Sequence, residues 1–214
     1  TPTFKINDFL HGSLTPLFFG SAIFSFGITQ LLDAIGNLGP QPKSRPSHKR
    51  AVNPNEEQVS GFVFKVQANM DQKHRDRIAF VRLCSGKFKR GMKLFHVRSG
   101  KLITISNPIF FLAQDRNILD EAWAGDIIGI PNHGQFMIGD SFTEREDLKF
   151  LGIPSFAPEI LKKVSTLDPL KAKHLEKALK QFAEEGVMKL FISEVTDIKI
   201  IGVVGPLQLD VLLE

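Results

Sequence analysis

Cysteine is almost absent from this chain of 214 residues, in which Cys84 is the only one. A single cysteine cannot form an internal disulfide, and a reducing compartment such as the cytoplasm fits this composition best. Cys84 stands among apolar residues of a predicted strand. This position indicates an inert buried thiol and not a nucleophile.

Signatures of nucleotide binding are also missing. No G-x-x-x-x-G-K-[ST] loop occurs in the sequence, so the chain has no means of cradling a triphosphate. Gly202 and Gly205 precede a predicted helix, but a dinucleotide fingerprint needs three glycines at fixed spacing. We attribute the pair to a tight turn between strand and helix, and expect no binding of guanine nucleotide by this chain alone.

The sequence has no catalytic or metal-binding constellation. His74, Arg75 and Asp76 resemble the start of a protein-kinase catalytic loop, but Val81 stands where that loop needs an asparagine. The six histidines are scattered, and none pairs at a ligand spacing with another or with the lone cysteine. No catalytic residue and no metal site are predicted, which disfavours a hydrolase.

No apolar run is suited to span a membrane. Residues 12–32 carry no charge, but Pro16, Gly20 and several hydroxyl side chains interrupt a lipid-facing helix. The N-terminus shows no signal peptide. Because the chain starts at Thr1 and stops at Glu214 within an apolar helical pattern, we expect it to be part of a longer protein.

Composition places the chain among ordinary soluble proteins, with 43% hydrophobic and 23% charged residues. The net charge of +4 favours anionic partners. A sizeable core can therefore form, and disorder is not the default expectation.

Four segments follow one another along the chain. Residues 1–40 predict a short buried strand at 17–19, a Gly-Ser-Ala turn, and a helix in which Ile28, Leu31, Leu32 and Ile35 fall at helical spacing. Residues 41–58 are rich in proline and basic residues and poor in apolar ones, which is typical of a linker.

Residues 59–146 predict an antiparallel β-domain. Phe62, Phe64 and Val66 alternate with Lys65 and Gln67, which is the period of a half-buried strand. Turn residues separate short apolar runs at 62–66, 78–84, 92–97, 102–105, 109–112 and 127–130. This spacing indicates a barrel or a sandwich.

Residues 147–214 predict a mixed unit. A strand at 156–164 is followed by Asp168 and Pro169, a helix N-cap and first-turn pair, and Gly186 ends the helix. Strands at 187–192 and 198–204 precede a helix that opens at Pro206. The resulting βαββα order is most of a ferredoxin-like unit without its last strand, so the fold class is mainly β with α+β.

A run of basic residues marks the predicted β-domain. Between residues 87 and 101 there is no acidic residue, and the basic residues are Lys87, Lys89, Arg90, Lys93, Arg98 and Lys101. On two hairpins these side chains predict a surface that faces the phosphates of RNA. A solvated face without a partner is the alternative explanation.

The first segment resembles the end of the GTPase domain of translational GTPases. The resemblance is carried by Pro-Leu-Phe-Phe-Gly-Ser-Ala at 16–22, Leu-Leu-Asp at 31–33 and Gly-Pro-Gln-Pro at 39–42. It implies that residues 1–40 are the remnant of an α/β GTPase domain. It also implies that Ser21 and Ala22 offer backbone N–H groups to a guanine carbonyl, with Gly20 allowing the close approach.

The rest of the chain resembles bacterial class-II peptide chain release factors. The matching runs lie at 61–71, 73–77, 79–82, 85–87, 90–94, 124–127, 132–134, 138–140, 150–159, 168–171, 184–186 and 204–211. Elongation factor G shares the glycines of the barrel and the Gly-Ser-Ala loop. Gln-Ala-Asn-Met at 67–70 and His-Arg-Asp-Arg at 74–77 favour the release factor.

The resemblance implies a translation-factor-type β-barrel at 59–146 and a partial ferredoxin-like domain at 147–214. The parent protein would use GTP and magnesium to eject class-I release factors from the ribosome, with the barrel docking on small-subunit RNA and protein. The phosphate loop, the magnesium-binding elements and the Asn-Lys-x-Asp motif would precede Thr1, so this chain is expected to be inactive alone. No membrane and no DNA partner are expected. A free-standing RNA-binding β-barrel module and a fragment of elongation factor G remain the alternatives.

Overall fold

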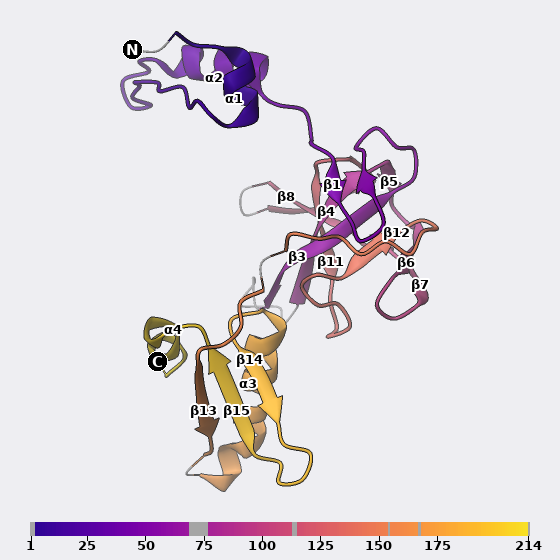
Figure 1. Cartoon of the computed structure of the whole chain (residues 1–214), viewed down its shortest axis with the longest axis vertical. Helices are drawn as coiled ribbons and strands as arrows, with labels where there is room; N and C mark the ends of the chain where they lie inside the picture. The colour runs from indigo at the N-terminus through magenta and orange to yellow at the C-terminus, as the bar shows by residue number, and fades with distance from the viewer. Residues whose placement is uncertain (1–2, 69–76, 113–114, 154, 167, 214) are drawn as a thin grey trace. The chain divides into compact units, whose positions relative to one another are not determined.

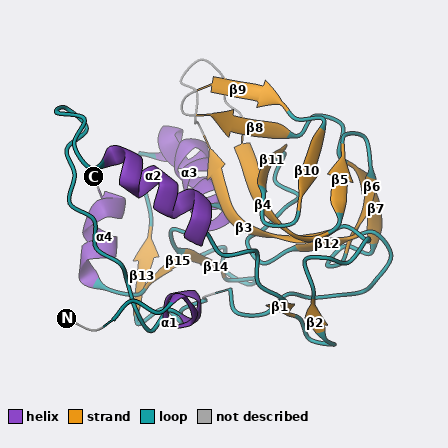
Figure 2. Cartoon of the chain, turned by 90° about the horizontal axis from the view of Figure 1, so that it is seen from above, coloured by secondary structure: helices purple, strands orange, loops and turns teal. Residues whose placement is uncertain are grey.

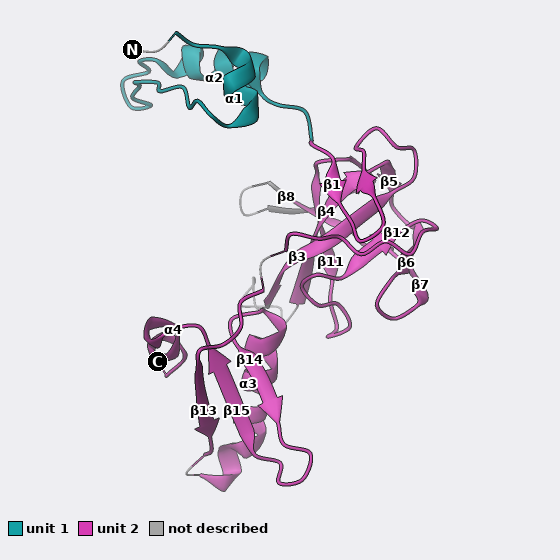
Figure 3. Ribbon diagram, in the orientation of Figure 1, with its two compact units in different colours: residues 1–42 teal, residues 43–214 magenta. Residues whose placement is uncertain are grey.

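The computed structural model describes residues 3–68, 77–112, 115–153, 155–166 and 168–213. The chain divides into two compact units, residues 1–42 and residues 43–214 (Figure 3). Among the described residues, no helix has both the length and the apolar character needed to cross a bilayer.

The first unit contains two helices, α1 (Ile6–His11) and α2 (Ile28–Leu38). The predicted helix is confirmed by α2, whereas α1 was not predicted. The buried strand expected at 17–19 is wrong, because Leu17 and Phe19 have no regular structure and are 77% and 76% exposed. A strand needs a neighbour for its backbone groups. Among the described residues of this unit, the only ladder contact is one bridge between Ser21 and Phe26.

The second unit begins with an antiparallel β-domain (Figure 1). Its main sheet has the order β7-β6-β12-β3-β4-β11-β8-β9, and a separate two-stranded ribbon pairs β10 with β5. The sheet strands are β3 (Ser60–Ala68), β4 (Arg77–Ser85), β6 (Lys93–His96), β7 (Lys101–Thr104), β8 (Ile109–Leu112), β9 (Asp115–Ile118), β11 (Ile127–Pro131) and β12 (Ser141–Thr143). The ribbon strands are β5 (Lys87–Lys89) and β10 (Glu121–Trp123).

This sheet confirms the predicted barrel-type domain. Seen from above, the strands curl around a common interior (Figure 2). The sheet is a half-barrel and not a fully closed one, since its hydrogen-bonded order ends at β7 and β9 among the described strands. Most strands lie within a few residues of the apolar runs that predicted them, because each run is bounded by turn residues such as Gly86, with φ of 74°.

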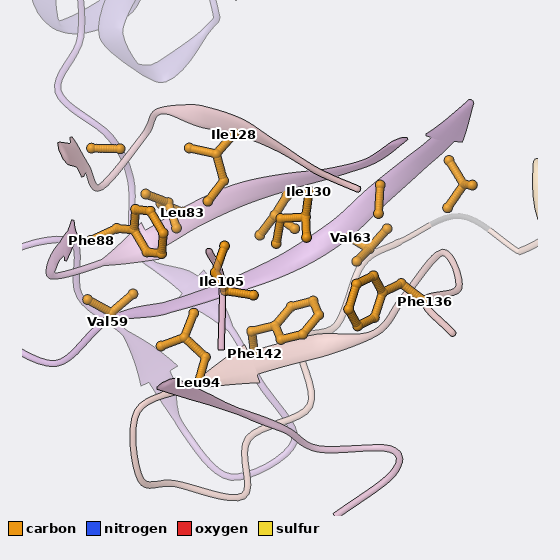
Figure 4. Packing of buried hydrophobic residues seen from close by; sticks show 14 residues of the cluster. Val59, Val63, Leu83, Phe88, Leu94, Ile105, Ile128, Ile130, Phe136 and Phe142 are labelled. Carbon is orange, nitrogen blue, oxygen red and sulfur yellow. The ribbon is translucent and has the colours of Figure 1, made fainter. Parts of the chain in front are cut away.

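The interior of the curled sheet holds the main hydrophobic core (Figure 4). Phe88, Phe136 and Phe142 are its largest fully buried side chains, and they come from the ribbon, from a loop and from β12. Burying each such ring stabilises the fold by about 2–3 kcal/mol relative to an exposed ring. The core therefore ties segments that lie far apart in the sequence into one domain.

A β-bulge changes which residues of β3 point into this core. The pairing of β3 with β4 shifts register between Val63 and Lys65. Val63 and Val66 are buried in the core, while Phe64 is 36% exposed. The predicted inward position of Phe64 is therefore wrong, because the extra residue of a bulge breaks the period of two.

A second, smaller cluster lies against the segment predicted to be a linker. Within residues 41–58 the chain forms a short hairpin of β1 (Arg45–Pro46) and β2 (Ala51–Val52). Val52 is fully buried and packs with Phe62, Cys84, Leu148 and Phe150. The segment predicted to be a linker therefore contains a short hairpin, which Val52 anchors to the β-domain.

The C-terminal part of the second unit has the predicted βαββα order. It consists of β13 (Ile160–Val164), the short 3₁₀ turn η1 (Pro169–Lys171), α3 (Ala172–Glu184), β14 (Lys189–Ile192), β15 (Lys199–Val203) and α4 (Pro206–Leu213). The antiparallel sheet has the order β13-β15-β14, as in three strands of a ferredoxin-like unit.

Local sequence signals explain where these elements begin. The Asp168 carboxylate accepts a hydrogen bond of 2.9 Å from the N–H of Leu170, which confirms the predicted cap, although the cap opens the 3₁₀ turn before α3. β13 starts at Ile160 and not at the predicted residue 156, because Pro158 has no N–H for a ladder hydrogen bond.

Candidate nucleic-acid interface

Lys87 lies on the β5–β10 ribbon, where the pairing brings acidic and aromatic residues beside it. Its register partner on β10 is Trp123, and Lys89 stands opposite Glu121. The Lys87 Nζ is 2.5 Å from a carboxylate oxygen of Glu121 and 4.8 Å from the centre of the Trp123 ring. Lys87 is therefore already engaged by an ion pair and a cation–π contact.

Arg90 occupies the turn that follows β5. Its Nε donates a hydrogen bond of 3.0 Å to the carbonyl of Ser106, and its guanidinium lies 3.7 Å from the Asp120 carboxylate. Gly91, next in the chain, has φ of 82°, which allows the chain to reverse. The guanidinium is held against the loop before β8 and is only partly available to a ligand.

Arg98 is 45% exposed, but its guanidinium is paired with the buried carboxylate of Asp140. Its Nε donates to Asp140 at 2.6 Å, and a second nitrogen donates to the same carboxylate at 2.8 Å. Asp140 also accepts the N–H of Met137 at 2.8 Å and lies 2.9 Å from Nε2 of the buried His96. The other ring nitrogen of His96 lies 2.8 Å from the Ser99 hydroxyl.

This cluster around Asp140 shifts the pKa of its charged members. Burial opposes ionisation of Asp140, but the hydrogen bonds from Arg98 and Met137 and the neighbouring His96 outweigh it and hold the pKa of the carboxyl below its ordinary value. The hydrogen bond to Asp140 raises the pKa of Arg98. Both groups are charged at neutral pH, and Arg98 serves the fold.

Three of the six predicted RNA contacts remain open. Lys89, Lys93 and Lys101 are exposed, and none of them makes an ion pair within the described parts of the chain. Lys93 begins β6 and Lys101 begins β7, so they lie at opposite ends of one hairpin. The hairpin spans three residue steps between them, which corresponds to about 10 Å.

Acidic residues from later segments explain why fewer cations are open than the basic run 87–101 predicts. The run 87–101 contains no acid, yet Asp120, Glu121 and Asp140 reach three of its cations in space. The ion pair with Lys87 lowers the pKa of Glu121, so this carboxylate is charged at neutral pH. The open basic surface is therefore smaller than the run predicts. Whether it contacts RNA stays a prediction.

The backbone of the loop Gly20–Ser21–Ala22 is engaged locally in this chain, and its contact with guanine stays a prediction for the parent protein. The N–H of Ser21 donates to the carbonyl of Phe26 at 2.8 Å and is not directed at a ligand. A side chain on Gly20 would meet that same carbonyl at 2.9 Å, so the glycine serves the local turn. With no phosphate loop in the sequence, no step of a nucleotide reaction can be derived for this chain.

Cys84 and the histidines show no sign of chemistry in the described parts of the chain. Burial raises the pKa of the Cys84 thiol to about 12, so it stays protonated and unreactive at neutral pH. No group of three metal-ligating side chains gathers among the described residues. The His-Arg-Asp run at 74–76 lies outside the described residues.

The sequence pattern missed Trp123 as part of this surface. It is the only tryptophan, it is 53% exposed, and it carries Lys87 over its ring. An exposed tryptophan on a short strand between acidic residues gave no periodic signal. Only the pairing of β10 with β5 shows that it stands beside the basic run.

Comparisons with known proteins assign both parts of the second unit. Residues 58–145 match the family model of elongation factor G domain 2, and residues 150–214 match that of the class II release factor RF3, C-terminal domain. The crystal structure of ttk003000868 from Thermus thermophilus is similar with a TM-score of 0.65 and 22% sequence identity. The likeness covers 86% of this chain and 27% of that chain, and at this identity it shows the fold.

Proposed function

Because this chain is built from domains of the translational GTPase family, of the class II release factor type, we propose that it docks a termination factor on the ribosome. The parent protein would promote the departure of class-I release factors in the cytoplasm. The intact parent protein would draw on GTP and magnesium. The chain itself would supply binding surfaces and no catalysis.

The observation that carries this proposal is the open part of the basic surface. Lys93 and Lys101 stand exposed on the paired strands β6 and β7, Lys89 stands exposed on β5 opposite Glu121, and none of the three makes an ion pair among the described residues. Lysines in this state are free to displace the counterions of RNA phosphates, which makes binding dependent on salt. The phosphates of small-subunit ribosomal RNA are the proposed ligands.

The choice between a release factor and elongation factor G depends on the C-terminal domain. The β-domain matches the elongation factor G model, but residues 150–214 match the release factor model. This match favours termination over elongation. A free-standing RNA-binding module remains the second candidate, and the open lysines support it equally.

Co-sedimentation with purified small ribosomal subunits tests the docking. We expect the double variant Lys89→Gln, Lys93→Gln to bind several-fold more weakly at 100 mM salt than the parent chain. Lys5→Gln, which removes an exposed lysine of the first unit, is the matched control and should leave binding unchanged. Equal binding by all three proteins would show that Lys89 and Lys93 do not contact the small subunit.

Competition separates the second candidate from the first. If the chain docks on the ribosome, it should bind intact small subunits more tightly than it binds an unstructured RNA as long as the ribosomal RNA of the small subunit. A chain that binds both equally would be a general RNA-binding module.

A further inference from the structure

The sheet of the C-terminal domain presents one face on which six residues stand in two rows. The register places Lys163, Ile200 and Phe191 side by side across the three strands. Leu161, Gly202 and Lys189 form the next row. Directly opposed residues of antiparallel strands point to the same face, and residues two apart along a strand also share it.

The two faces of this sheet differ in what covers them. Ile201 and Val203 point the other way and pack with Leu179 of α3 and with partly buried leucines of α4. Figure 1 shows α3 behind the sheet. Most of the six-residue face is open, with Leu161 and Phe191 exposed by 59% and 45%, whereas Gly202 is buried beneath Pro158.

The absence of a side chain at Gly202 allows the Phe191 ring to lie close to the central strand β15. A Cβ atom at Gly202 would lie 3.0 Å from Cε2 of Phe191 and 2.8 Å from Cβ of Pro158. Such contacts are too short for any other residue, so the missing side chain lets the Phe191 ring lean over the central strand. Gly202 lies within β15, and its attribution to the turn before the last helix is therefore wrong.

Two lysines flank the ring. Lys163 shares its row two strands away, and Lys189 precedes it by two residues on β14. Both are exposed. The Lys189 Nζ lies 3.4 Å from the hydroxyl of Ser155, and Lys163 has no ion pair among the described residues. The aromatic ring thus has Lys189 two residues away on its own strand and Lys163 at the far edge of the same face, beyond Ile200. The acids nearest in sequence to Lys163 and to the ring are Glu159, before β13, and Glu194, after β14.

We propose that this open face binds an unpaired nucleotide of RNA, with the base stacked on Phe191 and the phosphates near Lys163 and Lys189. Aromatic rings on an open sheet beside basic side chains are how proteins hold single-stranded RNA. A protein partner fits less well, because lysine is depleted in protein–protein interfaces. The inference rests on the proposed ribosome docking, where an unpaired ribosomal nucleotide would be the ligand.

Fluorescence anisotropy with an end-labelled eight-nucleotide adenine RNA and the full chain tests the stacking. We expect Phe191→Ala to weaken binding by about 5- to 150-fold, the range for losing one stacked base. Phe191→Tyr keeps the ring and should bind like the parent chain. Phe110→Ala removes a ring of comparable exposure, 39%, from the β-domain and serves as the control.

The salt dependence tests the two lysines separately. Replacing Lys163 or Lys189 with glutamine should reduce the slope of log K against log salt by about 0.7 each, as expected for a single strand. Gly202→Ala should weaken binding while both lysines and the ring are present, because the new methyl group displaces the ring.

The inference is overturned if Phe191→Ala, with an unchanged circular dichroism spectrum, binds the RNA like the parent chain. It is also overturned if the RNA does not bind and the chain instead dimerises through Phe191 in sedimentation velocity. In both cases small-subunit binding by the parent chain would leave the proposed docking intact. Failure of the parent chain to bind small subunits would instead contradict the docking itself.

Discussion

Asp140 joins segments that are far apart in the sequence. Its buried carboxylate receives hydrogen bonds from Arg98 and from the N–H of Met137, and it lies against His96 of β6. Its own carbonyl accepts the N–H of Val63 in β3. One residue therefore ties the β6–β7 hairpin and the loop before β12 to strand β3.

Replacing Asp140 with asparagine should destabilise the β-domain by about 2 kcal/mol, because the buried group loses the negative charge to which Arg98 donates two hydrogen bonds. The folded-state pKa of Asp140 is depressed. Its contribution is therefore complete above the ordinary carboxyl pKa of about 4 and is lost as the pH falls through the folded value. Urea unfolding of both proteins between pH 7 and pH 2 measures this.

Asp147→Asn is the control, since its ion pair with Lys49 is exposed and should contribute less than about 1 kcal/mol. A stability difference between the parent and Asp140→Asn that stays constant down to pH 2 would contradict the assigned charge.

At the residue scale, the sequence predicted which basic residues gather but not which remain open. Lys87, Arg90 and Arg98 stood in an acid-free run, and their acidic partners lie far along the chain, on β10 and in the loops before β10 and β12. Such pairings depend on strand register, which the apolar pattern of one strand does not specify. The cap at Asp168 was predictable because its partner lies two residues away.

At the scale of elements, strand positions were largely predictable and strand faces less so. Six apolar runs became β3, β4, β6, β7, β8 and β11, because turn residues bound each of them. The short strands β5, β9, β10 and β12 were missed. Their three or four residues carry too little alternation, and tertiary pairing decides them.

The bulge in β3 gives a direct test at this scale. Val63→Ala should cost about 2 kcal/mol, from two buried methyl groups of about 0.8 kcal/mol each and the cavity they leave. Phe64→Ala should cost about 1.5 kcal/mol, less than Val63→Ala although a larger side chain is removed, since the Phe64 ring is 36% exposed. Chemical denaturation of the two variants ranks them. A larger loss of stability for Phe64→Ala than for Val63→Ala would show that Phe64 points into the core and that β3 alternates regularly, without the effect of the bulge.

At the scale of the whole molecule, the two units differ in how well they bury their apolar residues. Neither α1 nor α2 has a buried residue, and Ile23 and Phe24 are 90% and 83% exposed. The second unit has three buried clusters of its own. Stability should therefore reside in residues 43–214.

Deletion of residues 1–42 should leave the main thermal transition within about 2 °C, because no core cluster loses a member and a loss of 1 kcal/mol shifts a midpoint by about 2–4 °C at this size. The shortened chain should also bind less of a hydrophobic dye. Differential scanning calorimetry of both chains measures the transition. Loss of cooperative unfolding after the deletion would show that the first unit contributes to the core.

We propose that this chain docks on ribosomal RNA. The decisive measurement is the binding of residues 43–214 to purified small ribosomal subunits across a salt series. We expect saturable binding whose log K falls linearly with log salt, because lysines displace phosphate counterions. Binding that is absent at low salt, or that does not change with salt, would contradict the claim.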